Sequence, residues 1–149
     1  MKNIIFLLIL FILTSCGYTS VYKNENEDIK ITIIDLKGDR KINNFIKSEL
    51  KSYINSSSSN NYKLIINNNY NKKINTKDTT GKAVDFQLNL NTDVQINKND
   101  KNKTSSFFET FKMKNSSDTF ALNEYENIIL KNFAKSIKQK IVLELVSFE

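Results

Sequence analysis

Histidine, tryptophan and proline are absent from this chain of 149 residues, and cysteine occurs once. Without histidine, the chain lacks the side chain that most often moves protons near neutral pH and most often binds metals. A single cysteine cannot form an intrachain disulfide, a thiolate metal cluster or a CxxC redox pair. These absences disfavour enzyme chemistry, and we expect neither a metal nor another cofactor.

The excess of positive charge comes almost entirely from lysine. Lysine and arginine together number 22 against 16 aspartate and glutamate residues, and Arg40 is the only arginine. A protein that reads nucleic acid is expected to use arginine more heavily, because the guanidinium group makes two-point contacts with phosphates and bases. We therefore expect no nucleic-acid partner. The length is enough for one domain with a single core.

The first 16 residues have the features of a secretory signal. Lys2 supplies a positive charge, residues 4–13 are all apolar, and the small residues Thr14 and Ser15 precede Cys16. Ten residues in a helix span about 15 Å, roughly half of a bilayer core, so this segment is too short for a stable transmembrane helix. A short apolar stretch after a basic start is typical of a signal peptide.

Two kinds of signal peptide fit this segment. An ordinary signal peptide can carry a cysteine near its end by chance. The sequence Leu-Thr-Ser-Cys at 13–16 looks like a bacterial lipobox, in which the cysteine thiol is diacylated and the chain is then cut just before it. The position of the only cysteine favours a lipoprotein, with residues 1–15 as the signal peptide and Cys16 as the lipidation site.

Acylation of Cys16 would anchor the protein to a membrane, because each buried methylene contributes about 0.8 kcal/mol and two chains make the anchor close to permanent. Gly17 follows the cysteine, in place of the aspartate that retains many Gram-negative lipoproteins at the inner membrane. We therefore expect the periplasmic face of the outer membrane. Residues 16–28 are interpreted as a lipidated tether that reaches about 40 Å if extended, although Val21 and Tyr22 also suit the start of an edge strand.

Strand and helix patterns follow one another after the tether. Residues 29–35 contain alternating isoleucines and predict a strand. From Asp39, which suits an N-cap, apolar residues recur at helical spacing as far as Ile54 and predict an amphipathic helix of about four turns. Residues 62–70 have strand character, and residues 71–82 are predicted as a loop or a frayed extension of that strand.

The clearest pattern is the period of two over residues 84–97. Apolar side chains take the even positions and acidic or amide side chains the odd ones, with Thr92 completing the even set. This predicts a long strand with one buried and one wet face. A turn at 98–103 leads into a second hairpin arm, and an apolar stripe from Leu130 to Phe148 predicts a closing helix.

The predicted order is therefore strand, helix, strand, strand, strand, helix (β-α-β-β-β-α). We interpret residues 29–149 as a single α/β domain with the architecture of an α+β two-layer sandwich. Both helices cover one face of a four-stranded mixed sheet, and the first helix connects two strands that can be parallel. The other face of the sheet is polar and can meet solvent, a partner or a polar ligand.

Four features stand together in this chain: the lipobox followed by CGYTSVY, a helix that starts at Asp39 and Arg40, the long alternating strand, and a last helix that starts with Ala121, Glu124 and Ile128. With these features, nearly the whole chain resembles the LPS-assembly lipoprotein family, LptE. The resemblance implies an outer-membrane lipoprotein that plugs a large LptD-like β-barrel. Such a protein assists lipopolysaccharide insertion into the outer leaflet by binding and templating, without covalent chemistry.

Two other functions stay open. A periplasmic lipoprotein with the same layers can act as an adaptor or stabiliser of an envelope transport complex without binding lipopolysaccharide. An enzyme would need a nucleophile with a base, and Ser-x-x-Lys does occur at Ser20 with Lys23 and at Ser48 with Lys51. The first pair lies in the tether, the second on the wet side of a helix, and the companion motifs are absent. We do not expect an enzyme.

Basic side chains are the candidate contacts to phosphate groups. Arg40 can bind a phosphate or a partner carboxylate at two points, or can simply pair with Asp35 or Asp39 at the helix start. Lysines between the strands can gather at one end of the sheet and suit the phosphates of lipid A, or can be solvated turn residues. These lysines are Lys72, Lys73 and Lys77 before the long strand and Lys98, Lys101 and Lys103 after it.

Aromatic and amide side chains complete the candidates. Phe107, Phe108 and Phe111 are expected in the core, with Glu109 between them pointing outward. The amides at the odd positions of the long strand can hydrogen-bond sugars or a barrel wall, or can form a plain wet face. These amides are Gln87, Asn89, Asn91 and Gln95.

Overall fold

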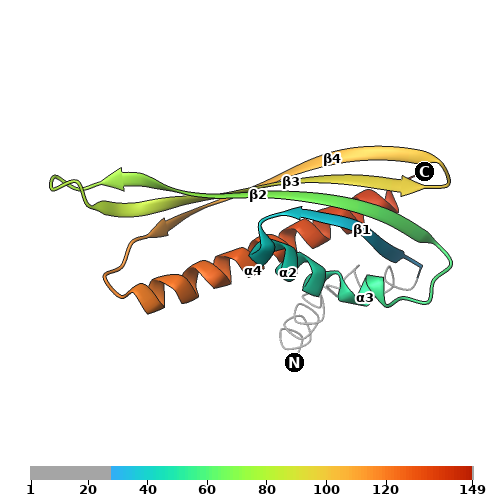
Figure 1. Ribbon diagram of the computed structural model, residues 1–149, viewed down its shortest axis with the longest axis horizontal. Coiled ribbons are helices and arrows are strands. Elements are labelled where there is room, and N and C mark those ends of the chain that lie inside the picture. Colours follow the sequence, from blue (N-terminus) through green and yellow to red (C-terminus); the bar gives the residue numbers. More distant parts are fainter. Residues whose placement is uncertain (1–27, 149) are drawn as a thin grey trace, which may run out of the picture.

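The computed structural model describes residues 28–148 as a four-stranded sheet with three helices on one of its faces (Figure 1). The predicted signal peptide, Cys16 and the possible strand start at Val21 and Tyr22 lie outside the described residues. In chain order the elements are β1 (Lys30–Gly38), α2 (Arg40–Glu49), α3 (Lys51–Ile54), β2 (Asn61–Lys77), β3 (Ala83–Lys98), β4 (Lys101–Lys114) and α4 (Thr119–Val146).

The sheet has the strand order β1-β2-β3-β4. β1 is parallel to β2, whereas β2 with β3 and β3 with β4 are antiparallel. The parallel pair requires a crossover, which α2 and α3 provide, and the two antiparallel pairs are joined by hairpins. The predicted mixed sheet and two-layer α+β sandwich are therefore confirmed.

The first predicted helix begins as expected but is divided in two. The Asp39 carboxylate accepts a hydrogen bond of 2.9 Å from the Ile42 N–H, which is an N-cap. The helix is interrupted at Leu50. Helical hydrogen bonds nevertheless continue through this residue, because the Leu50 N–H donates to the Ile46 carbonyl at 2.9 Å and the Leu50 carbonyl accepts from the Ile54 N–H at 3.0 Å. The described residues thus contain three helices where two were predicted.

The strands are longer, and their connections shorter, than the sequence pattern indicates. β2 continues through the predicted loop to Lys77, which pairs with Ala83. The remaining loop is organised by Asp78, whose carboxylate accepts from the N–H groups of Thr80 and Lys82. At the other hairpin, only Asn99 and Asp100 form the turn, with φ values of 49° and 64°. Positive φ at both residues is what a two-residue hairpin turn requires.

The even residues of β3 form the centre of the core. Leu88, Leu90, Val94 and Ile96 are at most 1% exposed, and the helices bury them from one side. Burial of each such side chain contributes roughly 1.5–3 kcal/mol. The helix residues of this core are Ile42, Ile46, Leu50 and Tyr53 from the α2–α3 region and Ile129, Leu130, Phe133, Ala134, Ile137, Ile141, Val142 and Leu145 from α4.

A buried polar ladder crosses the core between α2 and β3. Thr92, the polar member of the even set, donates from its hydroxyl to the Asn68 side-chain oxygen at 2.6 Å. The Asn68 amide donates to the Asn43 side-chain oxygen at 2.7 Å, and the Asn43 amide donates to the Leu36 carbonyl at 3.2 Å. All three ladder side chains are buried. Their mutual hydrogen bonds offset the cost of removing them from water.

The aromatic residues of β4 correct one prediction. Phe107 packs partly buried against the core, but Phe108 is 59% exposed and Phe111 is 38% exposed. Phe108 lies on the open face, and Phe111 makes an edge contact with the Tyr125 ring of α4. Glu109 faces α4 rather than outward, because it accepts hydrogen bonds of 2.6 Å from side chains of that helix. β4 is an edge strand that only α4 covers, so alternation alone does not bury its aromatic rings.

Candidate functional site

The two groups of predicted lysines lie at opposite ends of the sheet. Lys72 pairs with Leu88 near the β2–β3 hairpin, whereas Lys98 pairs with Lys101 at the β3–β4 hairpin. Leu88 and Lys98 are ten residues apart along β3, which corresponds to roughly 33 Å. Figure 1 shows the two hairpins at opposite ends of the molecule. The lysines therefore do not gather in a single cluster at one end of the sheet.

Lys72 is held by α4. Its ammonium group lies 2.6 Å from a carboxylate oxygen of Glu126 and 4.6 Å from the centroid of the Phe86 ring. The Tyr70 hydroxyl donates a second hydrogen bond of 2.7 Å to Glu126. Burial raises the pKa of Glu126, but the hydrogen bonds from Lys72 and Tyr70 outweigh it and hold that pKa below its usual value. Burial, and then the contact with Glu126, raise the pKa of Tyr70.

The β2–β3 end also carries unpaired lysines beside exposed apolar side chains. Lys73, Lys77 and Lys82 are exposed, and within the described chain none of them forms an ion pair. α4 begins at this end, below the hairpin in Figure 1. An apolar surface with a rim of positive charge suits an amphiphilic anion. The exposed apolar residues here are Ile74, Val84, Phe111, Phe120 and Tyr125, between 38% and 77% exposed.

At the β3–β4 end, most of the lysine charge is already engaged. Lys103 forms an ion pair of 2.6 Å with Glu144 of α4. Lys98 donates to the Tyr62 hydroxyl at 3.0 Å, and its ammonium group lies 4.4 Å from the centroid of that ring. Lys101 is exposed, and no ion pair involves it among residues 28–148. Of the three predicted residues here, Lys101 is the most available to a ligand.

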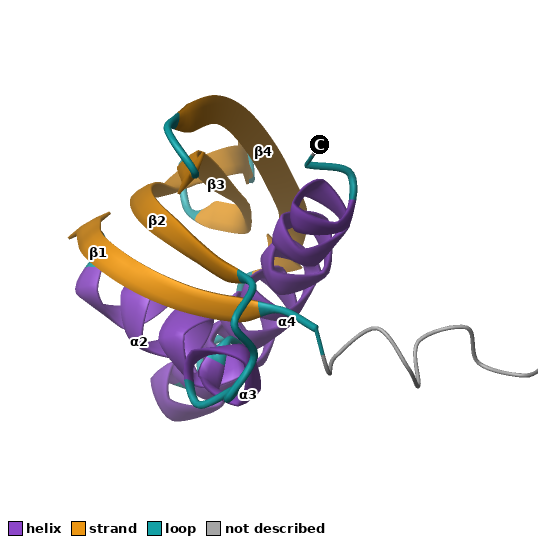
Figure 2. Cartoon of the chain, turned by 90° about the vertical axis from the view of Figure 1, so that its right-hand side faces the viewer, coloured by secondary structure: helices purple, strands orange, loops and turns teal. Residues whose placement is uncertain are grey.

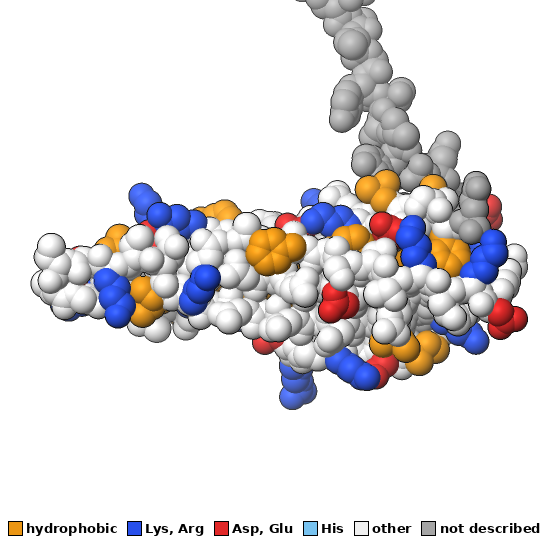
Figure 3. Space-filling view, turned by 90° about the horizontal axis from the view of Figure 1, so that it is seen from above, with side chains coloured by type: hydrophobic (Ala, Val, Ile, Leu, Met, Phe, Trp, Pro, Cys, Tyr) orange, Lys and Arg blue, Asp and Glu red, His pale blue; other side chains and the backbone are white. Residues whose placement is uncertain are grey.

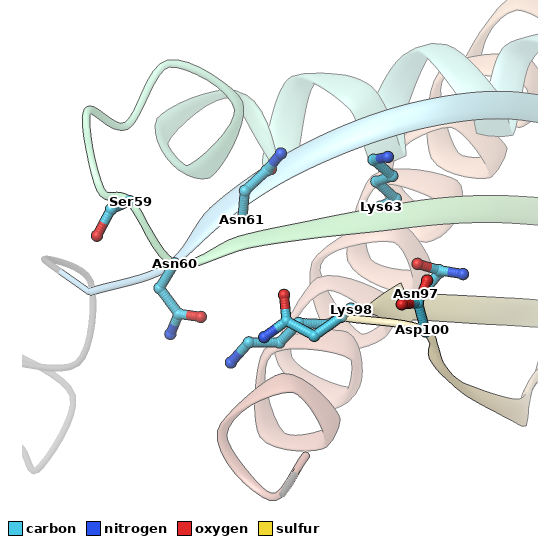
Figure 4. Close-up of a pocket in the computed structure, with 8 residues that line it drawn as sticks. Ser59, Asn60, Asn61, Lys63, Asn97, Lys98 and Asp100 are labelled. Atoms are coloured by element: carbon cyan, nitrogen blue, oxygen red, sulfur yellow. The ribbon is translucent and has the colours of Figure 1, made fainter.

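A polar cavity of about 460 Å³ lies at this end (Figure 4). Its walls come from the start of β2 and from the β3–β4 turn, so two segments far apart in the sequence meet there. Both charge signs and several amides are present, which suits a polar ligand without selecting its charge. The lining residues are Ser59, Asn60, Asn61, Lys63, Asn97, Lys98, Asn99 and Asp100.

Arg40 lies between these two ends, at the start of α2. The neighbouring Asp39 N–H donates to the carbonyl of Asn68, which pairs with Thr92 in the middle of β3. Arg40 is exposed, and it forms no ion pair in the part of the chain that the structure describes. Asp35 instead pairs with Lys37 at 3.3 Å, and Asp39 caps the helix. The Arg40 guanidinium is therefore free of both predicted carboxylate partners.

Amide and hydroxyl side chains predominate on the open face of the sheet. Gln87 and Asn89 both hydrogen-bond to Thr110 on β4, whereas Asn91 and Gln95 are exposed without such partners among the described residues. Figure 3, seen from the sheet side, shows a surface that is mostly neither charged nor apolar, with scattered basic, acidic and apolar side chains. Such a face can hydrogen-bond to a polar wall or a polar ligand over a wide area.

The sequence did not single out the carboxylates of α4 that hold these lysines. Glu126 and Glu144 are 18 residues apart, which is five helical turns, so they lie on the same face of α4. That spacing is visible in the sequence, but the lysine partners become apparent only when α4 is laid along the sheet. Through these carboxylates, α4 forms an ion pair with one predicted lysine at each end of the sheet.

Three further observations concern lipidation, metal binding and membrane crossing. Cys16 lies outside the described residues, so its lipidation stays a prediction. Within residues 28–148, no group of three or more acidic or thiol side chains is arranged to hold a metal ion. In that same range, the helices are too short or too polar to cross a membrane.

The fold matches solved lipoproteins. Rare lipoprotein B from Shewanella oneidensis superposes with a TM-score of 0.61 at 9% identity, over 79% of this chain and 94% of that one. A chain described as a lipoprotein from Caulobacter crescentus gives 0.52 at 15% identity, over 83% and 91%. Lipoprotein B from Nitrosomonas europaea gives 0.53 at 11% identity, over 80% and 85%. No family model and no curated protein sequence matches the chain.

Proposed function

We propose that this protein is an outer-membrane lipoprotein of the LPS-assembly (LptE) type, anchored at the periplasmic face through acyl chains on Cys16. It plugs an LptD-like β-barrel and assists the insertion of lipopolysaccharide into the outer leaflet. The observation that carries the proposal is a lipobox in front of a two-layer domain whose fold solved lipoproteins share over about four-fifths of the chain.

The open face supports a position inside a barrel. The lumen of a large outer-membrane barrel is polar, because its lipid-facing and lumen-facing residues alternate along each strand. Amides and hydroxyls cover the open face of this sheet and can hydrogen-bond to such a wall. The sheet is also long, since β2 and β3 have 17 and 16 residues, so it can line a wall over roughly 50 Å.

The β2–β3 end is the proposed contact to lipopolysaccharide. Lipid A is an amphiphilic anion, and this end combines exposed lysines such as Lys73 and Lys77 with exposed apolar side chains. Lys72 lies beside them and contributes less charge because Glu126 pairs with it. Arg40 and Lys101, with Lys98 and Lys103 beside it, are proposed as contacts to carboxylates of the barrel.

A second function, an adaptor that stabilises an envelope transport complex without binding lipopolysaccharide, has one observation in its favour. Two of the predicted lysines, Lys72 and Lys103, each form an ion pair of 2.6 Å with α4. Lysines paired in this way act in part to fix the helix on the sheet. In the adaptor account, the remaining lysines only keep the surface soluble.

Purification from native membranes in mild detergent separates the two functions. The C-terminally tagged protein and its Cys16→Ala variant are isolated in parallel, and the co-purifying proteins are identified. The plug account predicts one large outer-membrane barrel with the lipidated protein and much less of it with Cys16→Ala. Recovery of inner-membrane or soluble components without a barrel would contradict it and favour the adaptor.

A further inference from the structure

The outer edge of β1 has no strand partner within residues 28–148 (Figure 2). The Lys30 N–H donates to the Asn60 carbonyl at 2.9 Å, so the backbone of Lys30 faces β2. Because successive residues of a strand point their N–H and carbonyl groups to opposite sides, those of Ile31 and Ile33 point away from the sheet. Unpaired groups of this kind are a template for another strand.

The second half of this edge is closed by the chain itself. The register shifts between Ile33 and Asp35. Beyond that shift, the Asp35 carboxylate accepts a hydrogen bond of 2.8 Å from the Leu36 N–H. This N–H on the outer edge is therefore not available to another strand. A bulge and a local cap are two of the ways in which proteins block an edge. The open part is therefore the first half, residues 29–33, directly after the point where the chain enters the described structure.

An apolar groove runs beside the open edge. Its volume is about 470 Å³, and it lies between β1 and the α2–α3 helices. Ile34, in the groove wall, is 56% exposed. An isoleucine-rich edge strand of this kind is an aggregation risk if it stays uncovered. The apolar residues that line the groove are Ile31, Ile33, Ile34, Leu36 and Ile54.

We propose that residues 19–23 of this same chain cover the edge as an antiparallel strand, joined to β1 by a loop at 24–28. The segment Thr-Ser-Val-Tyr-Lys is rich in strand-forming residues, and Asn-Glu-Asn-Glu-Asp after it is a turn-forming sequence of suitable length. The chain also bends at Asp28, as a loop there requires. Five residues of strand span about 17 Å, which equals the length of the open part.

The register follows from the loop. With residues 24–28 as the loop, Val21 lies opposite Ile31 and Thr19 opposite Ile33, so the outward N–H groups of β1 gain partners. Val21 then shares the helix-facing side with Ile31 and covers the groove. Ser20 lies opposite Thr32 on the open face. No other segment needs to move, because residues 19–23 directly precede β1 in the sequence.

Docking of residues 19–23 would shorten the tether. This consequence rests on the proposed lipidation of Cys16. Only residues 16–18 would then connect the acyl chains to the sheet, a reach of about 10 Å instead of about 40 Å. The β1 edge would then be held close to the membrane surface. The docking itself does not depend on lipidation, so the two ideas fail separately.

Disulfide trapping tests the register in the mature chain with Cys16→Ala. Ser20→Cys and Thr32→Cys would face each other in a non-hydrogen-bonded pair, with Cα atoms about 4.5 Å apart, a separation that a disulfide can bridge. The matched control joins Ser20→Cys to Lys37→Cys, on the capped half of the edge. We expect an intrachain disulfide at least tenfold faster in the first pair. Equal rates, or a disulfide-linked dimer showing that a second copy covers the edge, would overturn the proposal.

Hydrogen exchange gives an independent measurement on the chain with Cys16→Ala. We expect the Ile31 and Ile33 amides to exchange at least tenfold more slowly than in a Val21→Pro variant, because proline removes the N–H that would pair with Ile31. A Glu25→Pro substitution in the loop is the control and should leave both amides protected. Fast exchange in the parent chain, or protection that Val21→Pro does not change, would overturn the proposal.

Discussion

The ammonium group of Lys72 on β2 lies 2.6 Å from a carboxylate oxygen of Glu126 on α4. The Glu126 side chain is only 14% exposed, and the Tyr70 hydroxyl donates to its other oxygen. The pair joins the outer layer of helix to the sheet near the proposed lipopolysaccharide contact. A carboxylate held by two donors in a partly buried site stabilises the fold most strongly when it is ionised.

Replacement of Glu126 by glutamine should lower the free energy of unfolding by about 1–2 kcal/mol at neutral pH. The pKa of Glu126 lies below its ordinary value of 4.5. Its stabilising effect is therefore fully present above that ordinary value and is lost as the pH falls through the lowered one. Urea unfolding at about pH 7 and about pH 3 should show the difference from the parent chain shrinking in acid. Glu124→Gln, exposed on the same helix, is the control; an equal loss at both pH values would contradict the account.

Asn68→Ala should destabilise the fold by about 2–4 kcal/mol, because it leaves the Asn43 oxygen and the Thr92 hydroxyl buried without their partners. Denaturant unfolding measures this loss directly. Asn69→Ala, on the exposed face one residue away, should change stability by less than about 0.5 kcal/mol. If the two variants were equally stable, the buried ladder would not be a structural element.

Gly38→Ala should be far more damaging than Gly81→Ala. Both glycines have positive φ, +91° and +85°. A Cβ at Gly38 would lie 1.7 Å from the Asn68 carbonyl oxygen, whereas at Gly81 it would meet nothing within 4 Å. We expect a loss of more than about 3 kcal/mol, or no folded protein, for Gly38→Ala, and about 1 kcal/mol for Gly81→Ala from the backbone strain alone. Thermal unfolding of the two purified variants measures both losses of stability. Equal losses would contradict the predicted ranking.

The double variant Lys73→Ala with Lys77→Ala should weaken binding of lipopolysaccharide to the purified protein by roughly fivefold to tenfold. Each exposed lysine is assigned about 0.6 kcal/mol of interaction with a phosphate. Lys101→Ala, at the opposite end of the sheet, should leave this binding within about twofold, and higher salt should reduce the difference. A larger effect from Lys101→Ala would place the lipid contact at the β3–β4 end.

Periodic, one-sided burial is what made the fold predictable. Leu88, Leu90, Val94 and Ile96 alternate because one face of β3 packs on helices, and Asp39 caps α2 through contacts three residues away. The extension of β2 to Lys77 was not predictable in this way, because polar residues there lie on both faces and leave no period to detect. The pairing with β3 that makes it a strand is not local.

The candidate site was less predictable for the same reason. The two groups of lysines flank β3, so the length of this strand places them at opposite ends of the sheet. The pairing of Lys72 with Glu126 and of Lys103 with Glu144 joins residues more than 40 positions apart. Those contacts depend on the way α4 lies along the sheet, and residue type alone does not fix that direction.

Photo-crosslinking in living cells from two opposite sides of the molecule tests the plug account most directly. A photoreactive amino acid replaces Phe108 on the open face and, separately, Leu143 on α4; the native side chains there are 59% and 53% exposed. A domain enclosed by a barrel touches it on both sides, so the account predicts that both positions cross-link to the same large outer-membrane protein. Cross-links from one side only, or to no such protein, would contradict it.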